Sequence, residues 1–230
     1  MPTTTNFGWT TPADTDLVKD GASAIRTLAN GIDTSFLDLK GGTTNQILKK
    51  NSNTDLDFVW AAPSSGALVL VGSTDFTTST SVVVSSCFSS TYDFYVAYVD
   101  FSAATGNAGY NVRMRLSGTS ASTNYNWNRD QWYGSTSAQA ETTSGSSFFV
   151  GEVSASYANR CGSIISFIDP ALARPTKIYS QARFVNVNQS VFGANIYGDH
   201  NTSTAYDSLE IFPDSGNVSG SVRVYAYAKS

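Results

Sequence analysis

The chain from residue 66 to its C-terminus limits the possible folds most strongly. Its apolar runs are short, rich in β-branched and aromatic residues, and separated by clusters of Gly, Ser, Thr and Asn. Runs of this kind are typical of strands, and the clusters are typical of turns. No helical apolar period follows residue 40, so we expect this whole segment to consist of strands.

Ten strands are predicted here, at residues 67–71, 82–88, 92–101, 111–116, 148–153, 162–168, 177–187, 190–197, 208–213 and 220–228. Because no helices intervene, the strands are expected to form packed antiparallel sheets. The predicted fold class is mainly β: a short coiled-coil-like helix and a β-hairpin, then an antiparallel β-sandwich of the jelly-roll type. The expected domains are an N-terminal anchor and helical stem (1–40), a hairpin (41–62) and a head (66–230).

The N-terminal region has a seven-residue period. Its a positions are Val18, Ile25, Ile32 and Leu39, and its d positions are Gly21, Leu28 and Ser35. An a/d seam with β-branched residues at most a positions is typical of a coiled coil. Since one such short helix is marginal alone, the seam predicts a parallel three-helix stem over residues 14–40; a helix packed on its own domain is the alternative. The expected stem contacts are Val18, Ile25, Leu28, Ile32 and Leu39.

The chain contains few charged residues. Charged residues make up 14% of the chain, and the net charge is −4, against a usual charged share of about 25%. No run of Lys or Arg exists, so no nucleic-acid partner is expected. No apolar stretch approaches the ~20 residues of a membrane span, and the first residues lack the basic and apolar parts of a signal peptide. Neither membrane insertion nor a signal peptide is therefore expected.

The sequence lacks an evident catalytic set. His200, the only histidine, lies in a polar stretch and is expected to be an exposed loop residue. Zinc-spaced Cys/His sets and a phosphate-binding loop are missing from the sequence. We therefore expect no enzyme, no catalytic residues, no cofactor and no metal. The three glutamates are expected on separate elements (Glu141, Glu152, Glu210). The aspartates Asp199, Asp207 and Asp214 are expected in turns. The two cysteines, Cys87 and Cys161, are expected to be buried free thiols rather than a disulfide.

One stretch, residues 123–134, interleaves four large aromatic residues with amides and one charge pair. Sugar-binding sites combine ring faces with amides, because a sugar is apolar on one side and polar at its edge. The candidate glycan-binding residues are Tyr125, Trp127, Trp132 and Tyr133. The alternative is that these aromatic residues pack in the core or at a subunit interface.

Residues 41–60, GGTTNQILKKNSNTDLDFVW, place two short apolar runs around a run of turn formers, which predicts a β-hairpin. The segment resembles a repeat of tailed-bacteriophage fibre proteins, although Asn45 stands where that repeat usually has Gly. Asn tolerates positive φ, so the turn stays feasible. Residues 7–33 also resemble the N-terminal part of such virion proteins, and residues 219–230 are similar to the last strand of several fibre heads.

The resemblance implies a homotrimer on the phage particle surface. Its N-terminal region would lie toward the particle and bind other virion proteins, and its head would point outward. The aromatic stretch adds a host-surface glycan as the candidate ligand of the head. The expected function is a short tail fibre or spike, with a capsid decoration or head-fibre protein as the alternative. A glycan-degrading enzyme is a third hypothesis, disfavoured by the missing catalytic set.

Overall fold

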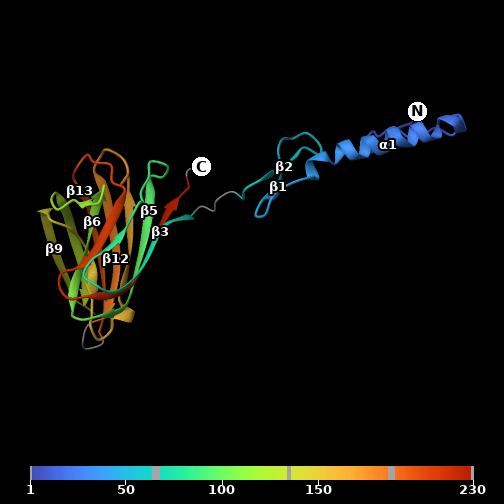
Figure 1. Ribbon diagram of the computed structural model, residues 1–230. Coiled ribbons are helices and arrows are strands. Elements are labelled where there is room, and N and C mark those ends of the chain that lie inside the picture. The colour runs from blue at the N-terminus through green and yellow to red at the C-terminus, as the bar shows by residue number, and fades with distance from the viewer. Residues whose placement is uncertain (1, 64–67, 134–135, 186–189, 229–230) are drawn as a thin grey trace. The chain divides into compact units, whose positions relative to one another are not determined.

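The computed structural model describes residues 2–63, 68–133, 136–185 and 190–228. Contacts divide the chain into two compact units, Met1–Ser64 and Ser65–Ser230. The first contains one helix and a two-stranded sheet, and the second contains two larger antiparallel sheets (Figure 1). The prediction of a mainly β chain with one N-terminal helix is confirmed.

In the first unit, helix α1 (Gly21–Ser35) lies between two short 3₁₀ helices, Val18–Asp20 and Leu37–Leu39. It is shorter than the expected 14–40, because its last turn tightens at Phe36 and the chain before Val18 is not helical. The N-terminal segment packs on this helix. The Trp9 indole Nε1 donates to Ser35 Oγ at 2.9 Å, and a Cβ on Gly31 would lie 3.6 Å from the same ring.

The predicted hairpin is confirmed. Strand β1 (Ile47–Lys50) pairs antiparallel with β2 (Phe58–Ala61), and Leu48 lies opposite Trp60. Asn45 adopts a φ of 71° in the turn before β1, as expected for an Asn that replaces Gly. Gly42 is required by the packing, because a Cβ there would lie 2.7 Å from the Trp60 ring.

The head consists of a large and a small sheet. The strands of the large sheet, in spatial order, are β3 (Leu68–Ser79), β15 (Val218–Tyr227), β5 (Phe94–Ala104), β11 (Gly162–Ile168), β12 (Thr176–Val185), β13 (Val191–His200), β8 (Tyr125–Tyr133) and β9 (Thr136–Gly145). The small sheet has the order β10 (Phe148–Val153), β6 (Ala108–Leu116), β14 (Ser208–Pro213) and β4 (Val82–Val84), and the short β7 (Thr119–Ser120) pairs with β6.

The order of the strands is that of a jelly roll. From β4 to β14 the chain crosses repeatedly between the two sheets. The small-sheet order β4-β14-β6-β10 is that of one sheet of an eight-stranded jelly roll. The order of β5, β8 and β9 in the large sheet is that of the other, with one strand expected between β5 and β8. The seventh strand is replaced by the meander β11-β12-β13. An antiparallel meander of three strands ends in the same direction as a single strand would, so the order of the remaining jelly-roll strands is unchanged. Strands β15 and β3 extend the large sheet beyond β5.

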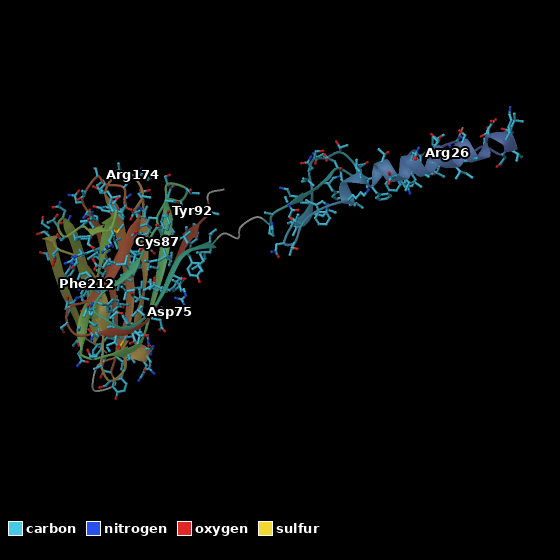
Figure 2. The ribbon with its side chains drawn as sticks, viewed as in Figure 1. Arg26, Asp75, Cys87, Tyr92, Arg174 and Phe212 are labelled. Carbon is cyan, nitrogen blue, oxygen red and sulfur yellow. The ribbon has the colours of Figure 1, made fainter. Side chains whose placement is uncertain are left out.

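Alternate residues of the facing strands form the core between the sheets. On β12 the residues at even positions from Thr176 to Phe184 are buried and those between them are exposed. Both cysteines are buried and free, as predicted, and Cys87 lies within the sandwich (Figure 2). Burial raises the pKa of the Cys87 thiol to about 12, so the thiol stays protonated and unreactive.

The strand predictions succeeded where strands are apolar. Three are reproduced to the residue: Phe148–Val153, Gly162–Ile168 and Ser208–Pro213. Two long strands, β8 and β9, were not among the predicted ten. Their sequences are dominated by polar residues, and such strands carry little apolar alternation.

Two glycines of β13 give a direct test of the sheet packing. A Cβ on Gly198 would lie 1.9 Å from the carbonyl oxygen of Asn126, whereas the nearest atom to a Cβ on Gly193 is 3.8 Å away. We expect Gly198→Ala to lower the free energy of unfolding by about 3 kcal/mol, because the backbone of β8 must move. Gly193→Ala should change it by less than about 0.5 kcal/mol. Chemical denaturation of both variants checks this, and equal stabilities would contradict the packing of β8 on β13.

Candidate functional site

The aromatic stretch singled out by the sequence forms strand β8, and its residues alternate between two surfaces. Tyr125 and Gln131 are fully buried and face the small sheet. Since neighbouring side chains on a strand point to opposite faces, Trp127 shares the inner face with them. Asn126 and Trp132 belong to the outer face of the large sheet. Only every second residue of this stretch is therefore available to an outside ligand.

Tyr125 and Trp127 pack inside the head. The Tyr125 hydroxyl accepts a hydrogen bond from the Met114 backbone N–H at 2.8 Å. The Trp127 ring is half-buried against Phe149 of β10, with centroids 5.7 Å apart. The expectation that Tyr125 contacts a glycan is corrected, because its ring has no exposed surface. Core packing, the alternative for these aromatic residues, describes both rings.

Trp132 lies on the outer face of β8 and is 43% exposed. It pairs with Gly193 of β13, and its indole lies 3.8 Å from the position that a Gly193 Cβ would take. The ring thus lies over a position without a side chain and keeps much of its surface exposed. Tyr133 ends β8, and its side chain is outside the described part of the structure.

Polar residues of three strands lie on the same outer face as Trp132. Asn126 Nδ2 donates to Asp199 Oδ1 at 2.7 Å, and Gln139 Nε2 donates to Asp130 Oδ1 at 2.8 Å. These bonds hold the amides and carboxylates in fixed orientations. The strand register then places Asn195 beside Asp130.

A second exposed aromatic ring completes this surface. Tyr197 of β13 pairs with Asn128 and is 47% exposed. It lies four residues from Gly193, hence ~13 Å along the strand from the row of Trp132. We name this surface the outer β8 surface; its residues are Asn126, Asn128, Asp130, Trp132, Asn195 and Tyr197. Two ring faces separated by amides and a carboxylate can stack on sugar rings and bind their hydroxyls.

The sequence alone did not indicate Asn195 and Tyr197. They are 63 or more positions from Trp132 along the chain, and only the pairing of β13 with β8 brings them onto one face. Alternation within 191–200 would have marked Tyr197 as outward-facing, but not which strand lies beside it. The sequence therefore identified one strand of the surface and missed the other.

His200 is buried, which corrects the expectation of an exposed loop histidine. It is the last residue of β13 and falls on the inner face, at 1% exposure. Its ring centroid is 4.2 Å from that of Tyr125, and its Nδ1 is 3.3 Å from the Tyr206 hydroxyl. Burial lowers the pKa of His200 below its ordinary value of 6.5, so the neutral form predominates at neutral pH.

The carboxylates are dispersed over the head. The three glutamates lie on different strands, as expected: Glu141 on β9, Glu152 on β10 and Glu210 on β14. Arg129 lies 3.5 Å from Glu152 and Arg115 3.7 Å from Glu210. Across the residues that the structure describes, no three or more His, Cys, Asp or Glu side chains gather to hold a metal ion.

The three candidate loop aspartates serve local structure. Asp207 Oδ2 accepts from the Ser117 backbone N–H at 2.9 Å, and Asp214 Oδ1 accepts from Asn111 Nδ2 at 2.6 Å. Asp199 lies within β13 rather than in a turn, which corrects its placement.

The predicted stem residues differ in exposure. Val18 is 98% exposed, Ile25 64% and Leu39 42%, whereas Leu28 and Ile32 are partly buried. The difference arises because the chain's own N-terminal segment packs on the helix through Trp9. The exposed a positions therefore have no apolar cover among the described residues.

A scan against protein-family models finds no match, and the sequence matches no curated protein. In the described chain, no helix has the length and apolar character needed to cross a membrane.

The burial of His200 predicts a pH dependence of stability. Because the folded-state pKa is lowered, the unfolded chain takes up a proton first as the pH falls below 6.5, and the stability of the head decreases there, by at most about 1.4 kcal/mol per pH unit for one proton. Above pH 6.5 this contribution is constant. His200→Phe should remove the decrease between pH 6.5 and 5. Denaturant unfolding across this range checks it, and an unchanged pH profile would contradict the assignment.

Proposed function

We propose that this chain is a structural virion protein of a tailed bacteriophage: a homotrimeric short tail fibre or spike whose β-sandwich head binds a host-surface glycan. The observation that carries the proposal is the exposure of three a-position side chains of the N-terminal region, Val18, Ile25 and Leu39. The head separately presents the polar and aromatic outer β8 surface. The resemblance of residues 7–60 to fibre proteins supports the same assignment.

The stem supports self-association. Val18 and Ile25 expose most of their side chains, and burying such side chains stabilises by about 1.5–3 kcal/mol each. In a parallel trimer of identical helices, the same a position of each chain lies in the same layer of the core. The a residues of three chains can therefore pack on one another. β-Branched a residues are typical of this packing.

The outer β8 surface supports adhesion. Trp132 and Tyr197 offer ring faces. The row between them holds Asn195 and Asp130, and the Asp130 carboxylate accepts a hydrogen bond from Gln139. A single such site is weak, but three heads on one stem bind one cell surface together, and linked sites gain 10²–10⁴ in avidity. In this proposal the protein needs neither catalysis nor a cofactor or metal, and its N-terminal region attaches it to other virion proteins.

The stem is tested by introducing a charge at its seam. Ile25→Asp should convert the trimer into monomers, because assembly would bury three unpaired carboxylates. Asn30→Asp adds the same charge at an exposed position away from the a/d seam and should leave the trimer intact. Sedimentation velocity of the full chain measures both. A monomeric parent protein, or a trimeric Ile25→Asp variant, would refute the stem.

The adhesive role is tested on assembled particles. Trp132→Ala should lower adsorption to host cells at least tenfold, since each lost ring contact costs ~1 kcal/mol or more and is repeated in three heads. The head should remain folded, because Trp132 lies on the outer face of the sheet and not in the core. Leu116→Ala removes an exposed apolar residue at the end of β6 and is the matched control.

Two results would redirect the proposal. Unchanged adsorption of Trp132→Ala particles, together with hundreds of copies per virion and a less heat-resistant capsid, would indicate the decoration or head-fibre alternative. Release of reducing sugar from host polysaccharide by the purified protein would instead indicate an enzyme.

A further inference from the structure

We infer that the heads bind one another through an apolar patch on the outer face of the large sheet, at the end opposite the outer β8 surface. This inference rests on the proposed trimer and adds a second, head-to-head interface to it. The patch consists of Leu68, Leu70, Tyr98, Ile164, Tyr225 and Tyr227.

The patch is continuous across four adjacent strands. Tyr227 and Tyr225 of β15 pair with Leu68 and Leu70 of β3. On the other side Tyr98 of β5 packs edge-on against Tyr225, with centroids 5.8 Å apart. Tyr98 in turn pairs with Ile164 of β11, so no strand interrupts the apolar surface.

The residues of the patch are large and apolar, yet they are exposed. Leu70 is 52% exposed, and Leu68, Tyr98, Ile164 and Tyr227 are each between 41% and 45% exposed. Shallow hollows lie between these side chains, one of them lined by Leu68, Tyr98, Arg223 and Tyr225. Projecting rings beside hollows suit a packed protein interface.

The charge and chemistry of the patch favour a protein partner. Arg223 borders it, and its guanidinium is bound to Asp75 at 2.6 Å, so no free cation is offered to a membrane or a phosphate. Amides, which a glycan requires, are concentrated instead on the outer β8 surface. Two identical patches do not repel each other, because neither carries a net charge at this point.

Chain connectivity identifies the partner as a second copy. The hairpin ends at Ala61 and β3 begins at Leu68, so at most ~25 Å of extended chain joins them. Leu68 and Leu70, which belong to the patch, are thus the head residues tied most closely to the stem. When three stems associate, three copies of this strand are held near one another.

The size of the patch agrees with a tethered contact. Four strands ~4.8 Å apart and five residues along them cover ~300 Å², which is well below the ~800 Å² per partner of a stable free interface. Short linkers, however, raise the effective concentration to millimolar values. A contact too weak to hold free heads together then suffices for heads on one stem.

The position of the patch at a sheet edge supports a covered state. β3 is an edge strand of the large sheet, and natural edge strands are protected by charges, bulges or a covering element. β3 has a bulge between Leu70 and Gly72, but Leu68 and Leu70 leave this part of the edge apolar and exposed. A neighbouring head would cover it in the trimer.

The test is a cross-linking experiment on the full chain. Tyr98→p-benzoylphenylalanine is expected to form, on irradiation, a covalent bond to head residues of another chain, identified by mass spectrometry. A second change, Leu70→Lys, should lower the yield of this product at least tenfold. Leu116→Lys introduces the same charge at an exposed leucine on the small sheet and should not affect the yield.

The outcomes separate this inference from the proposed function. A trimer in sedimentation velocity without the head-to-head product overturns the inference and leaves the stem trimer standing. A product with residues 2–63 of the same chain also overturns it. A monomer without any product overturns both. A trimer whose cross-link depends on Leu70 but not on Leu116 supports both.

Discussion

The close approach of β10 to β12 joins the two sheets of the head. The Ser180 hydroxyl, deep between the sheets, donates to the Val150 carbonyl oxygen at 2.8 Å. A Cβ on Gly151 would lie 2.6 Å from the Tyr110 hydroxyl and 2.9 Å from Ala182, so only glycine allows this spacing. The shift of register in β10 between Phe149 and Gly151 turns successive residues of this strand into the interior. The inner face of the large sheet is thereby closed to solvent.

Burial of one face of the large sheet determines which residues its other face presents. Alternate residues of β5, β11, β12 and β13 are buried against the small sheet, and the residues between them belong to one outer face that runs from β3 to β9. Its composition changes along the sheet: leucines and tyrosines at β3, β15 and β5, then amides, carboxylates and Trp132 at β13, β8 and β9. One sheet therefore presents an apolar group of side chains at the β3 end and a polar and aromatic group at the β8–β9 end.

Helix α1 also has one packed side and one exposed side. Gly31 and Ser35 are small enough for Trp9 to pack on them, and this uses one side of the helix locally. Arg26 projects from α1 (Figure 2), and the a position Ile25 beside it remains exposed. Gly31 thus leaves room for the N-terminal segment to fold back onto the helix.

The sequence by itself determined the elements with strong local signals: the N-terminal helix, the hairpin with Asn45 at positive φ, the apolar strands and the buried thiols. Residue type and spacing along the chain specify these, because the governing interactions are local or depend only on burial. The tertiary structure alone decided which residues share a surface. Tyr125 and Trp132 are alike in sequence context, yet strand parity buries one and exposes the other. His200 looked exposed because its neighbours are polar, but the pairing of β13 with β8 and β12 carries it to the inner face. Leu68 and Ile164, or Trp132 and Tyr197, come onto one face only through strand pairing across long stretches of chain, and no local pattern records such pairing.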